Sequence, residues 1–338
     1  MKVGLIGCGG MGTTHNHALK ALSEQMGITV TALADCREEF LRCAAGSWPQ
    51  AKCYQEGMEL LEYETLDAVH ICTPSYLHTK MVQKALEKGM HVFVEKPVCL
   101  TEEECRILEE AEKKSQKSVM VGQVVRSFPE YRYLKKVCED NIYGKLKSII
   151  MRRLSGNPAW GYEDWFHDTR KSGSVILDLH IHDTDFLRYL LGEPDAIEVS
   201  ASRFPSGMVN QIITTYIYKD VFANAEGIWD VSEQLPFEAS YRACFEHATI
   251  VFNGRSNPSL IVYEENGEIK EPELFKEYDV QDTAAGINIS EIGPYYTEIK
   301  YFYECLQQGK NNEVAPLSEG IASVRLALKE CVKADQMW

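Results

Sequence analysis

Hydrophobic and polar positions follow two different rhythms along the 338 residues of the chain. The first third repeats a short apolar stretch, a polar turn and an amphipathic stretch with helical spacing. Strands are predicted at 3–6, 28–34, 51–54, 68–72, 91–94 and 119–122, and helices at about 11–22, 36–45, 57–61, 75–88 and 101–114. Strands that alternate with helical crossovers form a parallel, doubly wound sheet.

The rhythm changes near residue 123. The remaining helices are predicted at about 128–140, 174–191, 294–308 and 317–336, with a long strand at 146–154. Between about 196 and 280, alternating residues are broken by hairpin signals at 205–207, 219–220, 253–254 and 266–267. We therefore predict an α/β protein with a parallel-sheet domain over 1–122. An α+β domain with a large, mostly antiparallel open sheet follows over 123–338. Whether the last helix packs back on the first domain is left open.

The first predicted strand runs directly into a glycine turn of the form GxGxxG at residues 7–12. The next predicted strand ends in Asp35, 23 residues after Gly12. This order binds dinucleotides, because Gly7 permits the tight turn, Gly9 admits the pyrophosphate and Gly12 lets the helix pack closely. Free N–H groups at the helix start would bind the phosphates. The alternative is a glycine-rich turn in another kind of α/β protein.

Charge and composition exclude several classes of function. The net charge of −15 argues against broad contact with nucleic acid or an anionic membrane. No stretch resembles a membrane span, and the first residues form a core strand rather than a signal peptide, so we expect a cytoplasmic protein. The 11 cysteines include no CxxC pair, so we expect reduced, mostly buried thiols and no zinc or iron–sulfur site.

Ligands of an open α/β sheet bind beyond the carboxyl ends of its strands. Lys96 follows such a strand directly and precedes Pro97. It is either a cation beside the nicotinamide that binds a substrate hydroxyl, or an ion-pair partner of Glu95. The residues predicted at these strand ends are Gly7, Cys8, Gly9, Gly10, Met11, Gly12, Asp35, Thr73, Pro74, Glu95, Lys96, Pro97 and Gln123.

A second cluster of chemically active residues occupies positions 178–185. At ~100° per residue, Asp178 and His182 lie on one helix face, and Asp185 stays within about a turn of both. A histidine with a carboxylate one turn away can accept a proton near neutral pH. Zinc is the alternative, but His180 and His182 diverge on a helix. We expect His180 to be structural and bonded to Asp183.

Weaker candidates lie outside these two clusters. The loop at 160–171 contains aromatic side chains, Trp165 among them, with polar neighbours. Aromatic side chains with polar neighbours can stack on the face of a sugar ring, but they are almost as typical of ordinary core packing. Arg126, Tyr241, Arg242 and His247 are further candidates for substrate contacts.

With these residues assembled, the chain resembles the Gfo/Idh/MocA oxidoreductases, relatives of glucose–fructose oxidoreductase and inositol dehydrogenase. The matching elements appear in the family's order at 7–12, 35, 73–78, 95–97 and 172–192. The part after residue 193 fits the family only in outline. The resemblance implies an NAD(P)-binding Rossmann domain followed by a domain for substrate binding and oligomerisation.

The resemblance also implies roles for single residues. Lys96 would touch both the nicotinamide and the substrate, and His182 would be the catalytic acid/base with Asp178 as its partner. Asp185 would bind a substrate hydroxyl.

For the cofactor, the resemblance implies that Asp35 binds the adenosine ribose and favours NAD, while Arg37 leaves room for NADP. His78 would belong to the same site, and the Lys96-Pro97 bond would be cis. Family members commonly form dimers or tetramers through the open second sheet, so we expect a homodimer or homotetramer.

The expected reaction is hydride transfer between NAD and a secondary hydroxyl of a sugar, cyclitol or glycoside. His182 would take the hydroxyl proton while Lys96 stabilises the alkoxide. Two alternatives remain: a redox-neutral glycosidase or epimerase whose NAD never leaves, and a ligand sensor without catalysis. Lys96, Asp178 and His182 together argue against the sensor.

Overall fold

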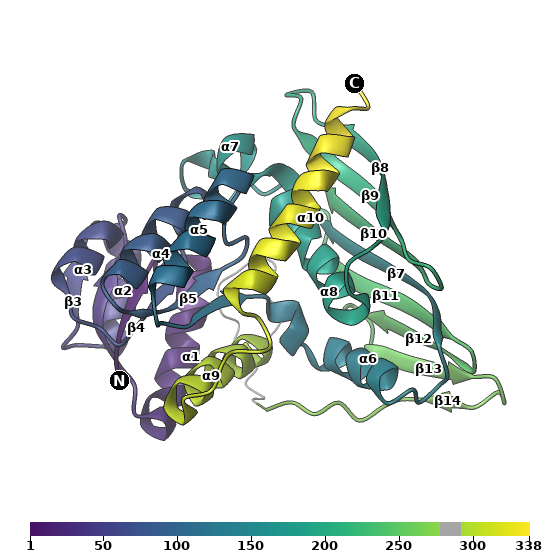
Figure 1. Ribbon diagram of the computed structural model, residues 1–338, viewed down its shortest axis with the longest axis horizontal. Helices are drawn as coiled ribbons and strands as arrows, with labels where there is room; N and C mark the ends of the chain where they lie inside the picture. The colour runs from purple at the N-terminus through teal and green to yellow at the C-terminus, as the bar shows by residue number, and fades with distance from the viewer. Residues whose placement is uncertain (278–291) are drawn as a thin grey trace. The chain divides into compact units, whose positions relative to one another are not determined.

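The computed structural model describes residues 1–277 and 292–338, and these divide into two compact units (Figure 1). Unit 1 comprises Met1–Ser127 and the described part of Glu277–Ala322. Unit 2 comprises Phe128–Lys276 and Ser323–Trp338. The chain therefore passes from unit 1 to unit 2, returns to unit 1 and ends in unit 2.

Unit 1 contains a parallel sheet of six strands in the order β3-β2-β1-β4-β5-β6, as predicted. Of its central strands, β4 is buried along its whole length, and β1 and β5 are buried except at their first residue, because helices of a doubly wound fold cover both faces. The strands are β1 (Lys2–Ile6), β2 (Thr29–Ala34), β3 (Lys52–Tyr54), β4 (Ala68–Ile71), β5 (His91–Glu95) and β6 (Val119–Gly122).

The crossovers of unit 1 are helical, as the apolar spacing predicts. Thr101 caps α5 by accepting a hydrogen bond from the Glu104 amide, the N-cap contact of an S/T-x-x-E capping box. The helices are α1 (Gly10–Met26), α2 (Glu38–Ser47), α3 (Gly57–Tyr63), α4 (His78–Glu87) and α5 (Glu102–Lys114), with 3₁₀ turns η1 (Ser75–Leu77) and η2 (Val124–Ser127).

A helix from late in the sequence completes the core of unit 1. Helix α9 (Gly293–Gln308) packs against α1, and its buried side chains join the core of β1, β2 and β5. The members contributed from this late segment are Tyr296, Ile299, Phe302, Tyr303 and Ala315. Unit 1 is thus built from two separate stretches of sequence.

Unit 2 is built on a sheet of eight strands in the order β14-β13-β12-β11-β7-β10-β9-β8. All neighbours are antiparallel except β7 and β10, which confirms the mostly antiparallel prediction. The four hairpin signals each join an antiparallel pair. The strands are β7 (Leu146–Ser155), β8 (Ala196–Arg203), β9 (Val209–Ile217), β10 (Phe222–Trp229), β11 (Glu238–Phe245), β12 (Ala248–Asn253), β13 (Leu260–Glu264) and β14 (Ile269–Lys270).

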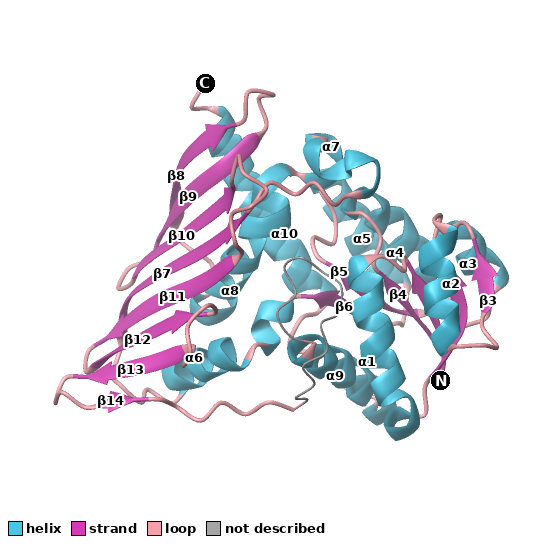
Figure 2. Ribbon diagram, turned by 180° about the vertical axis from the view of Figure 1, so that it is seen from behind, coloured by secondary structure: helices cyan, strands magenta, loops and turns pink. Residues whose placement is uncertain are grey.

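The helices of unit 2 lie on one face of this sheet (Figure 2). They are α6 (Pro129–Glu139), α8 (Ile181–Leu191) and the part of α10 (Leu317–Asp335) that belongs to unit 2. On the opposite face, β9 and β10 expose Ile213, Ile217 and Phe222, and β13 exposes Tyr263. Phe222 pairs with Ile217 across the two strands, so these two apolar side chains lie next to each other.

Several details differ from the predictions. The helix predicted at 174–191 consists of a π-helical turn (Ile176–His180) followed by α8, with the short helix α7 (Thr169–Ser172) before them. The last strand ends at Lys270, and residues 278–280 of the predicted strand region lie outside the described residues. All 11 cysteines are free thiols, but only four are buried, so the prediction that most are buried is wrong. Over the described ranges, no helix is long and apolar enough to cross a membrane.

Candidate active site

The glycine turn of unit 1 has the geometry that a bound dinucleotide requires. Gly7 has φ +85°, and a Cβ there would lie 2.6 Å from the Cys72 carbonyl oxygen. A Cβ on Gly12 would lie 1.7 Å from the Gly7 carbonyl oxygen, so α1 can approach β1 only with glycine at this position. Helix α1 begins at Gly10, and its N-cap, Gly9, provides no side-chain cap. Its first N–H groups are therefore available to an anion.

Asp35 lies directly after β2 and is fixed against the glycine turn. Its carboxylate accepts hydrogen bonds from the Cys8 amide at 2.7 Å and the Arg37 amide at 2.8 Å. The Arg37 guanidinium stacks on the ring of Phe40 and approaches Gly9, where a Cβ would lie 2.6 Å from Nη2. Asp35 and Arg37 thus both lie at the glycine turn, where sequence reasoning placed them.

The turns after β4 and β5 are joined by the buried side chain of His78. Its Nδ1 lies 2.8 Å from the Pro97 carbonyl oxygen, and its Nε2 lies 2.8 Å from the Thr73 carbonyl oxygen. Burial lowers the pKa of His78, although both carbonyl contacts oppose this shift. The Lys96-Pro97 bond is cis, as the resemblance implied. His78 therefore positions the backbone around Lys96 rather than offering a free side chain to a cofactor.

Two polar residues follow β6. The side-chain oxygen of Gln123 is buried and has no hydrogen-bond partner among the described residues. An unsatisfied buried acceptor beside a dinucleotide site fits a donor supplied by the cofactor. Arg126 is also buried, but its guanidinium donates to the Val314 carbonyl oxygen and to Glu319. These contacts hold Arg126 inside unit 1, so we leave it out of the substrate site.

In unit 2, the burial pattern separates Asp178 and His182 from their neighbours. Every residue from Ser172 to Arg188 is buried except these two, which are partly exposed. Asp178 lies in the π-helical turn and His182 in the first turn of α8. π-Helical turns are rare and occur frequently at functional sites. The acid and the histidine are thus the side chains that this segment presents at the surface of unit 2.

The predicted contact between His180 and Asp183 is wrong. The fully buried ring of His180 places Nε2 3.3 Å from both the Thr214 hydroxyl and the Tyr216 hydroxyl. The same nitrogen lies 3.6 Å from the Glu330 carboxylate on α10. The expectation that His180 is structural fits this environment, but its partners come from β9 and α10.

The two remaining acids of this segment are buried in unit 2. Asp183 forms a two-point ion pair with Arg153 on β7, with distances of 2.8 and 3.2 Å. Asp185 accepts a hydrogen bond from the Ser323 hydroxyl at 2.7 Å. Both contacts stabilise the packing of α8. Asp185 is therefore engaged within unit 2 and is not proposed as a substrate ligand.

The aromatic loop before α7 is well packed. Trp165 stacks on Phe166 at a centroid distance of 4.1 Å, and Phe166 contacts Trp229 of β10 at 6.0 Å. Phe166 is buried, whereas Trp160 remains 41% exposed. Phe166 is therefore the core residue of this loop. Trp165 is partly exposed, and its contact with the substrate stays a prediction.

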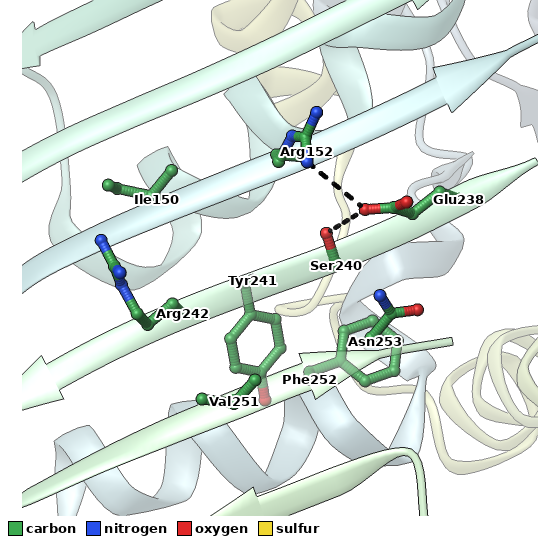
Figure 3. Close-up of a pocket in the computed structure, with 9 residues that line it drawn as sticks. All are labelled: Ile150, Arg152, Glu238, Ser240, Tyr241, Arg242, Val251, Phe252 and Asn253. Carbon is green, nitrogen blue, oxygen red and sulfur yellow. Dashed lines mark hydrogen bonds and ion pairs between the residues drawn. The ribbon is translucent and has the colours of Figure 1, made fainter. Parts of the chain in front are cut away.

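Tyr241 and Arg242 on β11 are separate in sequence from the segment that carries Asp178 and His182. Tyr241 is buried and donates a hydrogen bond to the Glu130 carbonyl oxygen of α6, while Arg242 is exposed on the opposite face. A pocket on β7, β11 and β12 includes both residues, with an Arg152–Glu238 ion pair and a Ser240–Glu238 hydrogen bond (Figure 3). His247 is exposed and contacts Glu265 at 3.1 Å. Nothing in this geometry supports a substrate contact for these three candidates.

Sequence reasoning missed a set of buried polar residues in unit 1. His15, His70 and Tyr303 form a hydrogen-bonded group that reaches Glu95, and Glu298 lies buried in α9. The one available signal was His70, a polar residue in the centre of an otherwise apolar strand. Across the described ranges, no group of three or more His, Cys, Asp or Glu side chains could hold a metal ion.

Comparison with known proteins agrees with this architecture of a dinucleotide-type unit joined to a unit with a large open sheet. Residues 1–123 match the model described as oxidoreductase family, NAD-binding Rossmann fold, and residues 131–269 match the GFO/IDH/MocA C-terminal domain. The chain belongs to the Gfo/Idh/MocA oxidoreductase family, as the motifs predicted. Unit 1 accordingly contains an NAD-binding Rossmann domain.

Three individual relatives share about a third of their aligned residues with this chain, or fewer. The chain is 32% identical over 193 residues to a myo-inositol 2-dehydrogenase of Thermotoga maritima, covering 57% of this chain and 55% of that protein. It is 31% identical over 134 residues to a 2,7-anhydro-N-acetylneuraminate hydratase of Escherichia coli, covering 40% and 36%. A solved levoglucosan dehydrogenase with NADH and levoglucosan has the same fold, with a TM-score of 0.85, 19% identity and coverage of 99% and 97%. The chain thus aligns with little more than half of the inositol dehydrogenase's length.

Proposed function

We propose that the protein is an NAD-dependent oxidoreductase that acts on a secondary hydroxyl of a sugar, cyclitol or glycoside. The observation that carries the proposal is the burial pattern at 172–188, where only Asp178 and His182 reach the surface. A partly exposed acid in a π-helical turn and a histidine just after it are suited to moving a proton, and an NAD-binding domain supplies the partner chemistry. The inositol dehydrogenase relative supports a polyol substrate.

The residues take the following roles in this proposal. NAD, when bound, supplies the hydride acceptor. Gly7, Gly9 and Gly12 admit its pyrophosphate, and the N-terminus of α1 binds the phosphates. Asp35 binds the adenosine ribose, which favours NAD over NADP, and Gln123 accepts a hydrogen bond from the cofactor.

The chain's own residues handle the substrate proton. His182 accepts the proton of the reacting hydroxyl, and Asp178 orients the imidazole and stabilises its charged form. The Lys96 ammonium stabilises the negative charge that develops on the substrate oxygen. Trp165 contributes an aromatic surface for the ring of the substrate.

The exposed face of the unit 2 sheet is proposed to join copies of this chain into a dimer or tetramer. Ile213, Ile217 and Phe222 lie exposed on that face. Apolar groups of this kind mark association surfaces in soluble proteins.

The first experiment measures absorbance near 340 nm with NAD and a panel of sugars, inositols and glycosides. Accumulation of NADH with one substrate supports the proposal. Lys96→Ala and His182→Ala should each lower kcat by roughly 10²–10⁴-fold, while the Kd for NADH stays largely unchanged. Lys80→Ala and His247→Ala are matched controls at other positions and should retain activity. Loss of NADH binding without a defect in turnover would refute these roles.

A redox-neutral reaction is the second candidate, because one relative is named a hydratase. In that case no free NADH accumulates, yet a glycoside or anhydro sugar disappears in the presence of protein that carries NAD. Chromatography of the substrate panel, run beside the absorbance assay, separates the two outcomes.

A further inference from the structure

Four buried side chains of unit 1 form one continuous hydrogen-bonded chain, the His15 chain. The Tyr303 hydroxyl lies 2.8 Å from His70 Nε2, and His70 Nδ1 lies 2.9 Å from His15 Nδ1. His15 Nε2 then lies 2.8 Å from a carboxylate oxygen of Glu95. His15, His70 and Tyr303 are fully buried, and Glu95 is 6% exposed.

Each ring nitrogen of His15 and His70 has a hydrogen-bond partner within the His15 chain. A carboxylate only accepts, so His15 donates its Nε2–H to Glu95. Burial and the neighbouring His15 hold the pKa of His70 well below its usual value, so the His70 ring is neutral. A neutral imidazole donates through one nitrogen and accepts through the other, so His70 is a donor to one of its two neighbours and an acceptor from the other.

The surroundings keep water away from these bonds. The Phe93 ring stacks on His70 at 5.1 Å and meets the edge of His15 at the same distance. Phe302 meets both rings edge-on, 5.6 Å from Phe93 and 6.2 Å from His70. Hydrogen bonds in such an apolar setting are stronger than in water, and breaking one leaves a buried polar group unsatisfied.

The His15 chain links the helix after the glycine turn, which is proposed to bind the cofactor, with the turn that carries Lys96. His15 stands on α1 three residues after Gly12, and Glu95 ends β5 immediately before Lys96. His70 lies in β4, which leads into Thr73, and Tyr303 comes from α9. One line of hydrogen bonds thus spans the glycine-turn helix, two adjacent strand ends and the late helix.

Glu298 adds a second acid beside the Glu95 end of the chain. It is 2% exposed, and neither carboxyl oxygen has a hydrogen-bond partner among the described residues. Burial, with the nearby Glu95 charge, raises the pKa of Glu298 well above its usual value. Glu298 therefore keeps its proton, whereas Glu95 is the acid that His15 contacts directly.

We propose that His15 is a positioning residue that fixes Glu95, and through it the turn carrying Lys96, relative to the glycine-turn helix, while His70 and Tyr303 hold the His15 ring in place. None of the three needs to touch the substrate or the cofactor. The proposal rests on the proposed function, because it assumes that the placement of Lys96 limits turnover.

Two substitutions of His15 test the proposal. In His15→Gln the amide reaches the position of Nε2 and can still donate to Glu95. In His15→Asn it reaches only the position of Nδ1, so the contact with Glu95 is lost. His17→Asn, on the same helix but outside the His15 chain, is the matched control.

We expect His15→Asn to lower kcat by roughly 10–10²-fold per NADH-binding site, with KM for the substrate within about threefold. His15→Gln should remain within about threefold of wild type in both constants. A purely structural role predicts fewer binding-competent molecules with an unchanged kcat per site. That result, or equal losses of kcat in both variants, would overturn the proposal.

A second readout does not depend on turnover. Reductive ¹³C-methylation of lysines, with Lys96→Arg to assign the signal, reports the surroundings of Lys96 in NADH-bound protein by NMR. The Lys96 signal should move in His15→Asn and stay in place in His15→Gln and His17→Asn. If wild type oxidises no polyol but the signal behaves this way, the proposed function fails and the positioning role stands. An unmoved signal in His15→Asn would refute the positioning role even in an active enzyme.

Discussion

Replacing Glu298 with glutamine should change how the stability of the protein depends on pH. The native state keeps a proton on this buried carboxyl, because burial and the Glu95 charge raise its pKa well above the usual value. In the unfolded chain a glutamate has a pKa of about 4.3 and is ionised above about pH 5.5. The native state then binds one proton more than the unfolded state. The free energy of unfolding must therefore fall as pH rises.

The size of the effect follows from linkage. One extra proton in the native state lowers the free energy of unfolding by about 1.4 kcal/mol for each pH unit. The decline continues until the pH reaches the native-state pKa and then levels off. Glu298→Gln removes the titrating proton and retains the shape of the side chain. For each pH unit over this range, the free energy of unfolding of Glu298→Gln should therefore rise by about 1.4 kcal/mol relative to that of wild type.

Urea unfolding of both proteins at several pH values measures the difference directly. His70 and His78, whose pKa values are lowered by burial, titrate in both proteins, and their contributions cancel in the comparison. Cys72 and Glu95 face the same region and are also common to both. Glu304→Gln, on the same helix with a partly exposed carboxylate, serves as the control and should follow wild type. Parallel curves for Glu298→Gln and wild type would show that the native carboxyl is ionised and would refute the reasoning.

Two further predictions concern the cofactor turn and the open sheet. Gly12→Ala should weaken NADH binding on the order of tenfold or more, because its Cβ would collide with the Gly7 carbonyl and displace α1. Calorimetric titration checks this, with Gly46→Ala, which has open space around it, as the control. Phe222→Glu places a charge among the exposed apolar residues of the sheet and should lower the oligomer mass measured by light scattering. Val231→Glu, at a more exposed apolar residue that lies outside the strands, should leave that mass unchanged, and a monomeric wild type would contradict the proposed interface.

Much of the fold was predictable because its signals are local. The six parallel strands, the glycine turn and the capping box at Thr101 each depend on residues close together in sequence. The hairpins of unit 2 were predictable for the same reason. The contribution of α9 to unit 1 was not, because no local pattern tells an amphipathic helix which apolar surface will cover it.

The candidate site was predictable in its residue types but not in its partners. Asp178 and His182 share a helix face at ordinary helical spacing, and the structure leaves only these two partly exposed. The π-helical turn could not be foreseen, because an apolar stripe is compatible with either helix type over so few residues. His180 and Asp183 were assigned to each other, yet their hydrogen-bond partners, Thr214 and Tyr216 for His180 and Arg153 for Asp183, are distant in sequence. Only the folded chain brings such partners together.

The late position of α9 has a consequence for how the protein is made. The core around β1 and β5 needs Phe302 and Tyr303, which follow the end of the Rossmann match at residue 123 by about 180 residues. At typical synthesis rates the ribosome needs roughly 9 to 36 s to cover that distance. During this interval the apolar surface of the first strands and α1 that α9 will cover stays uncovered. The strands of unit 2 are synthesised meanwhile and can begin to pair with one another. The first domain to be synthesised is thus among the last to be completed, and ending the gene after the sheet of unit 2, before α9, would leave the core of unit 1 uncovered.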